Sequence, residues 1–407
     1  MKIAIVGYGI EGKASYDYWS EGNELTIVDE REAVDGLPDG VPVILGAEAF
    51  TKLADFDLII RSPGINPHKL PYETKVWSAT NEFFEKCPAP IIGVTGTKGK
   101  GTTCSLIASI LRAAGKSVHL VGNIGAPALA ELARIKADDI VVYELSSFQL
   151  WDVTASPHVA VVLMIEPDHL DVHESMDDYI AAKANIGRFQ QASDLMVFNA
   201  QNELSRSIAT LSAARKFEYP QPIEHLLSSF KLPGRHNIDN ASAAVAATQQ
   251  YVQNPDVIAR GLGAFTGLPH RLKFVAEKAG VKYYDDSIAT TPGSAIAALS
   301  SFDEPKLIIL GGHDKGADYT ELVESCARTV STVLAIGSNG PRIARMCREA
   351  GVSVTETDGG MRDIVRESAA IAQSGSVVVL SPAAASFDMF SGYADRGDQF
   401  VAAVEQI

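Results

Sequence analysis

The sequence predicts an α/β protein of three domains, each built around a parallel sheet. Short apolar runs typical of strands alternate with helical stretches along the whole chain, which is the pattern of parallel α/β folds. The 407 residues exceed what one ordinary core contains. Proline-containing connections at residues 86–90 and 265–269 divide the chain, so we expect domains at 1–90, 91–267 and 268–407.

The first section begins with a strand at residues 2–6, followed by a helix that starts at Lys13 and further strands at 25–28 and 58–60. Gly7, Gly9 and Gly12 follow the first strand in the G-x-G-x-x-G pattern, and Asp29 follows the second. This combination is typical of a turn that holds a nucleotide diphosphate. The pattern by itself fits NAD, FAD, another nucleotide or a purely structural turn.

A phosphate-binding loop opens the second section. The apolar run 89–94 leads into the glycine-rich stretch Gly93–Thr103 and then into a helix predicted at 104–114. Backbone N–H groups of such a turn point at phosphates, and a lysine, here Lys100, reaches the outer ones. Gly101 follows the lysine where Ser or Thr usually holds Mg²⁺, so we expect Thr102 to take that role. The loop residues expected to bind ATP are Gly96, Thr97, Lys98, Gly99, Lys100, Gly101 and Thr102.

Polar residues follow the later strands of this section, predicted at 118–121, 140–143, 159–165 and 194–198. Glu144 comes directly after one of them, where it would face the ligand crevice as a candidate magnesium ligand. His169 lies in the acidic run 166–171, which fits a cation site, a general base or a solvated turn. The spacing around Lys183, on a predicted helix, indicates only a surface lysine.

The third section repeats the arrangement, with strands predicted at 281–284, 306–310, 332–336 and 376–380. Polar or glycine-rich clusters follow strands at 285–292, 311–316 and 381–388, and others lie at 233–240, before an alanine-rich helix, and at 267–271. Such clusters in all three sections predict one ligand cleft to which each section contributes.

Composition excludes some classes of partner. The formal net charge of −15 argues against a nucleic acid or an anionic membrane, because either would need a basic face. The four cysteines are dispersed, which is typical of reduced thiols in a cytoplasmic protein. We see no signal peptide pattern and no apolar run of membrane-spanning length.

Together these motifs resemble those of the Mur ligase family of peptidoglycan synthesis, and the resemblance extends through the whole chain. The stretch Gly93–Thr103 resembles the ATP loop of the family, and residues 122–125 and 144–149 resemble its next two blocks. Residues 148–149 and 267–271 favour the D-glutamate-adding branch, and residues 386–397 resemble its C-terminal signature.

The resemblance implies a Rossmann-like domain for UDP, a central ATPase domain and a Rossmann-like domain for the amino acid. It implies an ATP-dependent ligase that adds D-glutamate to UDP-N-acetylmuramoyl-L-alanine through an acyl phosphate, in the cytoplasm and as a monomer. The implied cofactors are ATP and two Mg²⁺ ions, with Lys183 carbamylated so that it can bridge to the metal.

The resemblance also implies roles for individual residues. The residues implied to hold the UDP-sugar are Gly9, Ile10, Glu11, Asp29, Glu30, Arg31, Ser62, Pro63, Gly64 and Asn123. Those implied to bind ATP outside the loop are Asn240, Arg271 and Asp286. Those implied to hold the amino acid are Thr290, Lys315, Ser386, Phe387 and Tyr393. The metal would be held by Thr102, Glu144, His169 and Lys183, and the catalytic set would be Lys100, Glu144, His169 and Lys183.

Two departures from the family pattern keep alternatives open. Gly101 replaces the usual hydroxyl residue, and Ile288 stands where many relatives have a lysine, so the metal ligand and the added amino acid are both in question. The alternatives are a sister ligase that adds lysine, diaminopimelate or glutamate to folate, an NAD-linked oxidoreductase suggested by the first glycine motif, and a non-catalytic nucleotide-binding protein.

Overall fold

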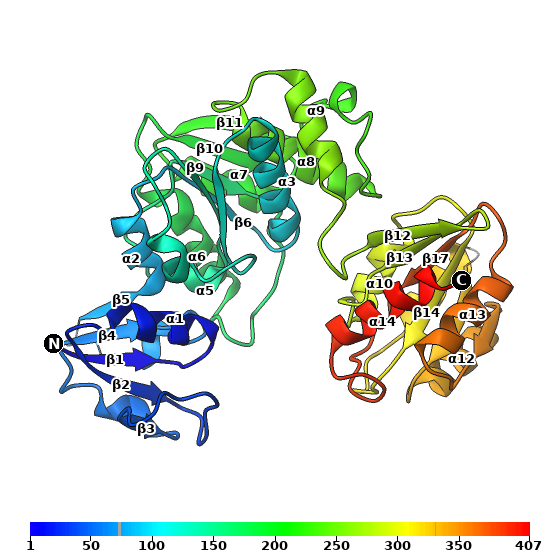
Figure 1. The fold of residues 1–407 in the computed structure, drawn as a ribbon, viewed down its shortest axis with the longest axis horizontal. Helices are drawn as coiled ribbons and strands as arrows, with labels where there is room; N and C mark the ends of the chain where they lie inside the picture. The colour runs from blue at the N-terminus through cyan, green and yellow to red at the C-terminus, as the bar shows by residue number, and fades with distance from the viewer. Residues whose placement is uncertain (72–74, 330) are drawn as a thin grey trace. The chain divides into compact units, whose positions relative to one another are not determined.

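The computed structural model describes residues 1–71, 75–329 and 331–407, which form two compact units (Figure 1). The first unit comprises Met1–Phe230 and Asp239–Ala264, and the second comprises Lys231–Ile238 and Phe265–Ile407. The first unit contains two sheets and the second contains a third. The predicted α/β class with mainly parallel sheets is confirmed. Each sheet lies within one of the three sections expected from sequence, whose limits remain a prediction.

The N-terminal sheet is parallel throughout, with strand order β3-β2-β1-β4-β5. Ile3 and Ile5 on its central strand are fully buried, because helices and loops cover both faces of a parallel sheet. Its strands are β1 (Lys2–Val6), β2 (Glu24–Asp29), β3 (Val43–Leu45), β4 (Leu58–Arg61) and β5 (Val76–Ser78). Its helices are α1 (Ile10–Trp19) and α2 (Ala79–Lys86), with 3₁₀ turns at Ala49–Lys52 and Pro67–Lys69.

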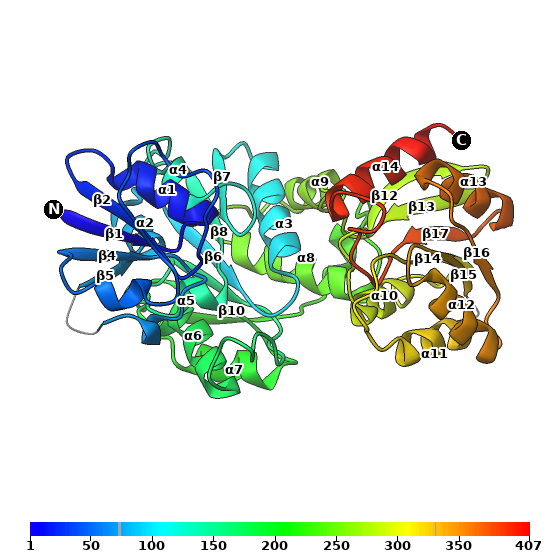
Figure 2. The same cartoon turned by 90° about the horizontal axis from the view of Figure 1, so that it is seen from below.

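The central sheet is also parallel, in the order β11-β10-β9-β6-β8-β7. Its strands are β6 (Ile91–Thr95), β7 (Val118–Gly122), β8 (Ile140–Glu144), β9 (Val159–Val162), β10 (Leu195–Asn199) and β11 (Arg215–Tyr219). Its helices are α3 (Lys100–Ala113), α4 (Ala128–Leu132), α5 (Ser147–Leu150), α6 (Met176–Arg188) and α7 (Glu203–Thr210), followed by a 3₁₀ turn at Glu224–Leu226, α8 (Arg235–Thr248) and α9 (Pro255–Ala264). Helix α9 lies beside α3 (Figure 2), and the Ser109 hydroxyl donates to the Gly261 carbonyl at 2.7 Å.

The third sheet has the order β12-β13-β17-β14-β15-β16, and only β12 runs antiparallel to its neighbour. Its strands are β12 (Lys273–Lys278), β13 (Val281–Asp285), β14 (Lys306–Gly311), β15 (Thr332–Ile336), β16 (Val354–Glu356) and β17 (Val377–Leu380). Its helices are α10 (Pro292–Leu299), α11 (Thr320–Arg328), α12 (Gly340–Glu349), α13 (Met361–Ile371) and α14 (Tyr393–Glu405). The edge strands β12 and β16 were not expected from the sequence pattern.

Several predicted boundaries were wrong. Helix α1 begins at Ile10 and α3 at Lys100, ahead of the predicted starts at 13 and 104, because both glycine turns lead directly into the first helical turn. Gly99 makes this possible in α3, since it has a φ of +86°. Strand β9 ends at Val162 and not at 165, because Met164 turns its carbonyl toward the amide of Thr97 in the phosphate loop. The polar run 233–240 does not precede the alanine-rich helix but enters it at Arg235.

None of the helices in the described residues is long and apolar enough to cross a membrane.

Candidate active site

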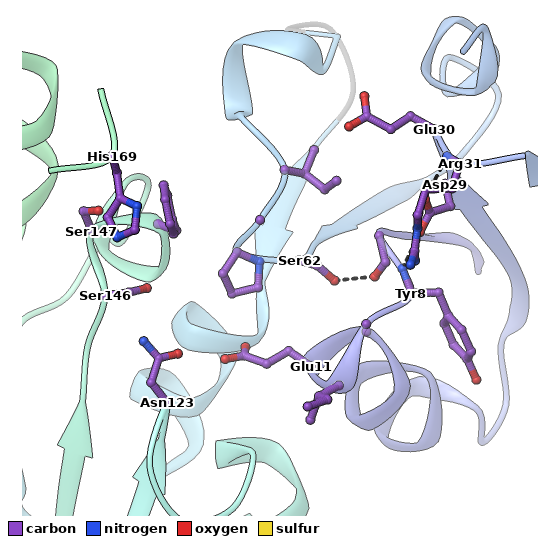
Figure 3. A pocket seen from close by; sticks show the side chains of 18 of the residues that line it. Tyr8, Glu11, Asp29, Glu30, Arg31, Ser62, Asn123, Ser146, Ser147 and His169 are labelled. Atoms are coloured by element: carbon purple, nitrogen blue, oxygen red, sulfur yellow. Dashed lines mark hydrogen bonds and ion pairs between the residues drawn. The ribbon is translucent and has the colours of Figure 1, made fainter. Parts of the chain in front are cut away.

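A pocket of about 630 Å³ in the first unit lies where the carboxyl ends of the N-terminal and central sheets meet (Figure 3). Every residue expected to bind the UDP-sugar lines it, and so do Lys100, His169 and Lys183 of the expected catalytic set. The full lining is Gly7, Tyr8, Gly9, Ile10, Glu11, Gly12, Asp29, Glu30, Arg31, Ser62, Pro63, Gly64, Ile65, Lys100, Asn123, Ser146, Ser147, Phe148, Asp168, His169, Tyr179 and Lys183.

The glycine turn after β1 forms one side of the pocket. Gly7 has a φ of +84°, and a Cβ on Gly12 would lie 2.1 Å from the Gly7 carbonyl oxygen, so both positions require glycine. The Ser62 hydroxyl donates to that carbonyl at 2.5 Å, which fixes the loop after β4 against the turn. A glycine turn of this kind, leading directly into a helix, is a typical place for a diphosphate to bind.

Asp29, at the end of β2, is occupied by hydrogen bonds within the protein. Its carboxylate accepts from the Tyr8 amide at 2.9 Å and from the Arg31 guanidinium at 2.8 and 2.6 Å. Burial alone would raise the pKa of Asp29, but these hydrogen bonds outweigh it and lower the pKa. In an NAD site the equivalent carboxylate accepts from a ribose hydroxyl. The pairing of Asp29 with Arg31 therefore disfavours the NAD interpretation.

Glu11 connects the two sheets at the floor of the pocket, because its carboxylate accepts from the Gln149 side chain of α5 at 2.6 Å. Burial raises the pKa of Glu11, opposed by the Gln149 hydrogen bond and by the charge of Arg61. Gln149 in turn completes a capping box with Ser146 at the start of α5. The wall formed by α5 is thus fastened to the N-terminal sheet.

Arg61 provides a second connection between the sheets, which sequence reasoning missed. Its guanidinium is fully buried and binds both carboxylate oxygens of Asp152, at 2.7 and 2.6 Å. It also donates to the carbonyl oxygens of Ser62, Pro63, Ile65 and Phe148. A single cation thus holds the loop after β4 and helix α5 in place on opposite sides of the pocket.

The phosphate loop joins β6 to α3 as predicted. Gly96 and Gly99 have φ values of +153° and +86°, and the Lys100 ammonium donates to the carbonyls of Gly96 and Thr97 at 3.0 Å each. Asn240 of α8 contacts this loop, since a Cβ on Gly99 would lie 2.4 Å from its Oδ1. Asn240 is therefore placed beside the loop where the expected phosphates would bind.

Lys183 is not the surface residue that its spacing indicated. Its side chain on α6 is 2% exposed, and its Nζ lies 2.9 Å from the Gly96 carbonyl and 4.7 Å from the centre of the Tyr179 ring. Burial, followed by the charge of Lys100, lowers the pKa of Lys183 well below its usual value. The surface expectation was wrong because the side of α6 that carries Lys183 faces the phosphate loop. The sequence does not show which side of the helix faces inward.

Glu144 lies at the end of β8, and His169 lies in the connection that follows β9, seven residues after the strand ends at Val162. Glu144 is the last residue of β8, which pairs with β6 through Val94, so it lies beside the start of the phosphate loop. His169 has a φ of +54°, is half exposed and stands against the Phe148 ring at 4.9 Å. Among the described residues, no group of three or more His, Cys, Asp or Glu side chains could hold a metal by itself. A magnesium ion here would depend on phosphate oxygens and water as further ligands, which is its usual mode of binding.

In the second unit, the residues expected to hold the amino acid follow three neighbouring strands, β13, β17 and β14. The His313 amide donates to the Ala385 carbonyl at 2.8 Å, which joins the loop carrying Lys315 to the loop carrying Ser386. Ser287 donates to the Tyr393 carbonyl, also at 2.8 Å. Phe387 and Tyr393 expose 68% and 44% of their surface, which is unusual for aromatic side chains and leaves them available to a ligand. The sheet thus collects Thr290, Lys315, Ser386, Phe387 and Tyr393 at its carboxyl edge.

Asp286, expected to contact the nucleotide, is buried in this unit. Its carboxylate accepts from the Ser381 hydroxyl at 2.7 Å and from the Leu272 amide at 3.0 Å. Burial raises its pKa from 3.8 to about 7, despite the Ser381 hydrogen bond. The group therefore retains a proton near neutral pH more readily than an ordinary aspartate.

We expect this raised pKa to make stability depend on pH. The folded carboxyl binds its proton more tightly than the unfolded one, so its stabilising contribution is complete below pH 3.8 and is lost as the pH rises to about 7. The loss should amount to a few kcal/mol. Thermal unfolding of the full chain between pH 4 and pH 8 should show a steeper decline for the wild type than for Asp286→Asn, which cannot titrate. Parallel profiles would contradict the expectation.

Comparison with known proteins identifies the class. The Mur ligase middle domain matches residues 94–248, and the Mur ligase glutamate ligase domain matches residues 270–384. The chain belongs to the Mur ligase family.

Within that family, the chain is similar over its full length to proteins named UDP-N-acetylmuramoylalanine--D-glutamate ligase. The one from Acetivibrio thermocellus is 37% identical, with 100% of this chain and 96% of the relative covered, and the one from Clostridium kluyveri is 34% identical, with 98% and 95% covered. Among solved structures, the UDP-N-acetylmuramate-alanine ligase of Thermotoga maritima matches with a TM-score of 0.61 at 18% identity, covering 100% of this chain and 99% of that one. A MurF structure from Acinetobacter baumannii matches with a TM-score of 0.60 at 17% identity, covering 86% and 85%. These two structures support the fold.

Sequence reasoning missed part of the pocket. Tyr8, Ile65, Ser146, Ser147, Phe148, Asp168 and Tyr179 line it without having been assigned a role. Tyr8, Ile65 and Asp168 stand next to an assigned residue, whereas Ser146, Ser147, Phe148 and Tyr179 do not.

Proposed function

We propose that this chain is an ATP-dependent ligase that adds D-glutamate to UDP-N-acetylmuramoyl-L-alanine in peptidoglycan synthesis. The observation that carries the proposal is that one pocket is lined both by the glycine turn after β1 and by Lys100, His169 and Lys183 from the connections and helices of the central sheet. A UDP-linked acid held on the turn would place its carboxylate near the phosphate loop. Full-length similarity to ligases named for this reaction supports the same substrate.

The chemistry follows from the poor reactivity of a carboxylate. Transfer of the γ-phosphoryl group of ATP to the alanyl carboxylate releases ADP and gives an acyl phosphate, whose carbonyl carbon the amine of glutamate then attacks. The amide C–N bond forms as the C–O bond to phosphate breaks, and the amine proton is released. Lys100 and the N–H groups of the loop would hold the phosphates against their mutual repulsion. Magnesium, when bound, supplies positive charge beside the phosphates, and Glu144, His169 and Thr102 are the side chains proposed to hold it.

Lys183 is proposed to act as a carbamate. Only a neutral amine reacts with CO₂, and the burial that lowers the pKa of Lys183 favours that neutral form near neutral pH. Lowering the pH through that pKa should protonate the amine and disfavour carbamylation. The resulting carboxylate would lie near the Gly96 carbonyl, at the phosphate loop, where it could bridge to the metal.

The second unit is proposed to deliver the amino acid through Thr290, Lys315, Ser386, Phe387 and Tyr393, with Arg271 and Asp286 reaching ATP. Lys315 would bind a carboxylate of glutamate. One chain supplies every assigned residue, so we propose a monomer, acting in the cytoplasm where ATP is available.

The rival functions have less support. A decayed, non-catalytic loop is disfavoured because the loop keeps its lysine, Lys100, which lines the pocket, and because Asn240 lies beside Gly99. A sister ligase with another amino acid is the nearer rival, since Ile288 replaces a cation beside the amino-acid loops.

The test is a panel of amino acids offered to the protein with ATP, Mg²⁺ and UDP-N-acetylmuramoyl-L-alanine, with products identified by mass. We expect the D-glutamyl product, and phosphate release only when all four components are present. A product containing L-glutamate, lysine or diaminopimelate would show that the chain is a sister ligase with a different amino-acid substrate. Equal phosphate release without any amino acid would contradict ligation.

A further inference from the structure

Behind the α5 wall of the pocket, three side chains form a hydrogen-bonded line. The Ser147 Oγ lies 3.0 Å from Nε2 of His173, and Nδ1 of His173 lies 2.8 Å from Oδ2 of Asp178. Ser147 is the first residue of α5 and lines the pocket, where Figure 3 shows it on the same side as His169. His173 precedes α6, and Asp178 lies in the first turn of that helix.

The imidazole of His173 is held rigidly. Its side chain is fully buried, and the Phe148 ring stacks on it at 5.4 Å with an interplanar angle of 9°. The rings of Trp151 and Tyr179 lie 4.2 and 5.2 Å away. A ring enclosed by three aromatic side chains cannot turn, so its two nitrogens keep their partners.

The direction of the hydrogen bonds in this line follows from Asp178. Its Oδ1 accepts from the indole N–H of Trp151 at 3.0 Å, and its Oδ2 accepts from the Glu174 amide at 3.3 Å. A carboxylate in this position makes Nδ1 of His173 the donor, as in the Ser-His-Asp arrangement of hydrolases. When the ring carries a single proton and Nδ1 holds it, Nε2 is an acceptor, so the hydroxyl proton of Ser147 points at His173 and away from the pocket.

We propose that Ser147 contacts the substrates as an obligate hydrogen-bond acceptor for an N–H group beside the reacting carboxylate. His173 and Asp178 are positioning residues that act through Ser147. The N–H group belongs either to the alanyl amide of the UDP-sugar acceptor or to the amine of the incoming amino acid. This inference rests on the proposed function and deepens it by assigning a residue that recognises nitrogen.

The chemistry of the pocket explains why such an acceptor is useful. Phosphates and carboxylates dominate the proposed substrates, and an ordinary serine hydroxyl would donate its proton to them. With the proton committed to His173, the Ser147 oxygen can only accept, so it selects N–H over oxygen anions. A hydroxyl turned the other way would leave an N–H donor facing a donor, which is costly in a buried site.

The test compares Ser147→Ala with Asp178→Asn, and uses Asp177→Asn as the matched control. Asp177 is the exposed neighbour of Asp178 in the same helical turn. In Asp178→Asn, the side-chain oxygen should stay with the Trp151 N–H, so that the amide nitrogen faces His173. That donor would reverse the ring tautomer and turn the Ser147 proton into the pocket.

We expect Ser147→Ala and Asp178→Asn each to worsen one constant, the Kd, the KM or the kcat, by about 10-fold to 100-fold, while Asp177→Asn keeps wild-type values. The Ser147→Ala/Asp178→Asn double variant should lose no more than Ser147→Ala alone, because Asp178 acts only through Ser147. Merely structural roles would instead give additive losses. Thermal unfolding shows whether each variant is folded. We expect Ser147→Ala to fold, because the substitution removes only one oxygen atom.

Two measurements distinguish the sources of the N–H group. If it is the alanyl amide, the Kd for UDP-N-acetylmuramoyl-L-alanine alone rises in both variants. If it is the amine, that Kd is unchanged and the loss appears in kcat or in the KM for the amino acid. Product formation by the unaltered protein tests the proposed function separately. Ser147→Ala with wild-type Kd, kcat and KM, or additive losses in the double variant, would overturn the inference.

Discussion

Replacing Lys183 with methionine is expected to lower the rate of ligation by about 100-fold to 1,000-fold, the effect seen when a preorganised charge is removed from an active site. Methionine fills similar space but can neither be carbamylated nor hydrogen-bond to the Gly96 carbonyl, which Lys183 does at 2.9 Å. Because the defect is chemical, added bicarbonate should not restore the rate. Ligation measured by phosphate release and product mass provides the readout.

The matched control is Lys216→Met. Lys216 is an exposed lysine of β11 that also donates to backbone carbonyls, those of Ser212 and Ala214, but lies outside the pocket lining. We expect it to keep wild-type turnover. Carbon-13 NMR with labelled bicarbonate should give a carbamate signal in the wild type and in Lys216→Met but not in Lys183→Met. Full activity of Lys183→Met would rule out the carbamate role.

Replacing Arg61 with methionine is expected to lower the free energy of unfolding of the first unit by about 3–5 kcal/mol, the cost of breaking a buried ion pair. The substitution would leave the Asp152 carboxylate, 24% exposed, without its cation, and four backbone carbonyls without a donor. Thermal unfolding should shift down by several degrees. Affinity for the UDP-sugar should also fall, because the loop after β4 would no longer be held against α5.

Arg215→Met provides the control for Arg61, since Arg215 is an exposed arginine at the start of β11 in the same unit. We expect its unfolding temperature to remain within about one degree of the wild type, as for most surface substitutions. An Arg61→Met protein that matched this control in unfolding temperature and in UDP-sugar affinity would show that the connection between the sheets contributes little.

Motifs that depend on local sequence were predicted well. The glycine turn at 7–12 and the phosphate loop at 93–103 could be located because a strand, a tight turn and a helix start are specified by neighbouring residues. That the two motifs line one pocket could not be predicted in the same way, because it requires the carboxyl ends of two different sheets to face each other. The spacing of residues along the sequence does not indicate how two sheets pack against each other.

The sequence by itself determined the fold class, the two glycine-rich turns between a strand and a helix, and the position of Glu144 at the end of a strand, because each depends on short-range pattern. Only the tertiary structure decided that Lys183 is buried beside the phosphate loop, that Arg61 joins two sheets, and that Ser147, His173 and Asp178 form one line. These contacts join residues up to 91 positions apart, and their energies come from burial and charge pairing that exist only once the sheets have packed.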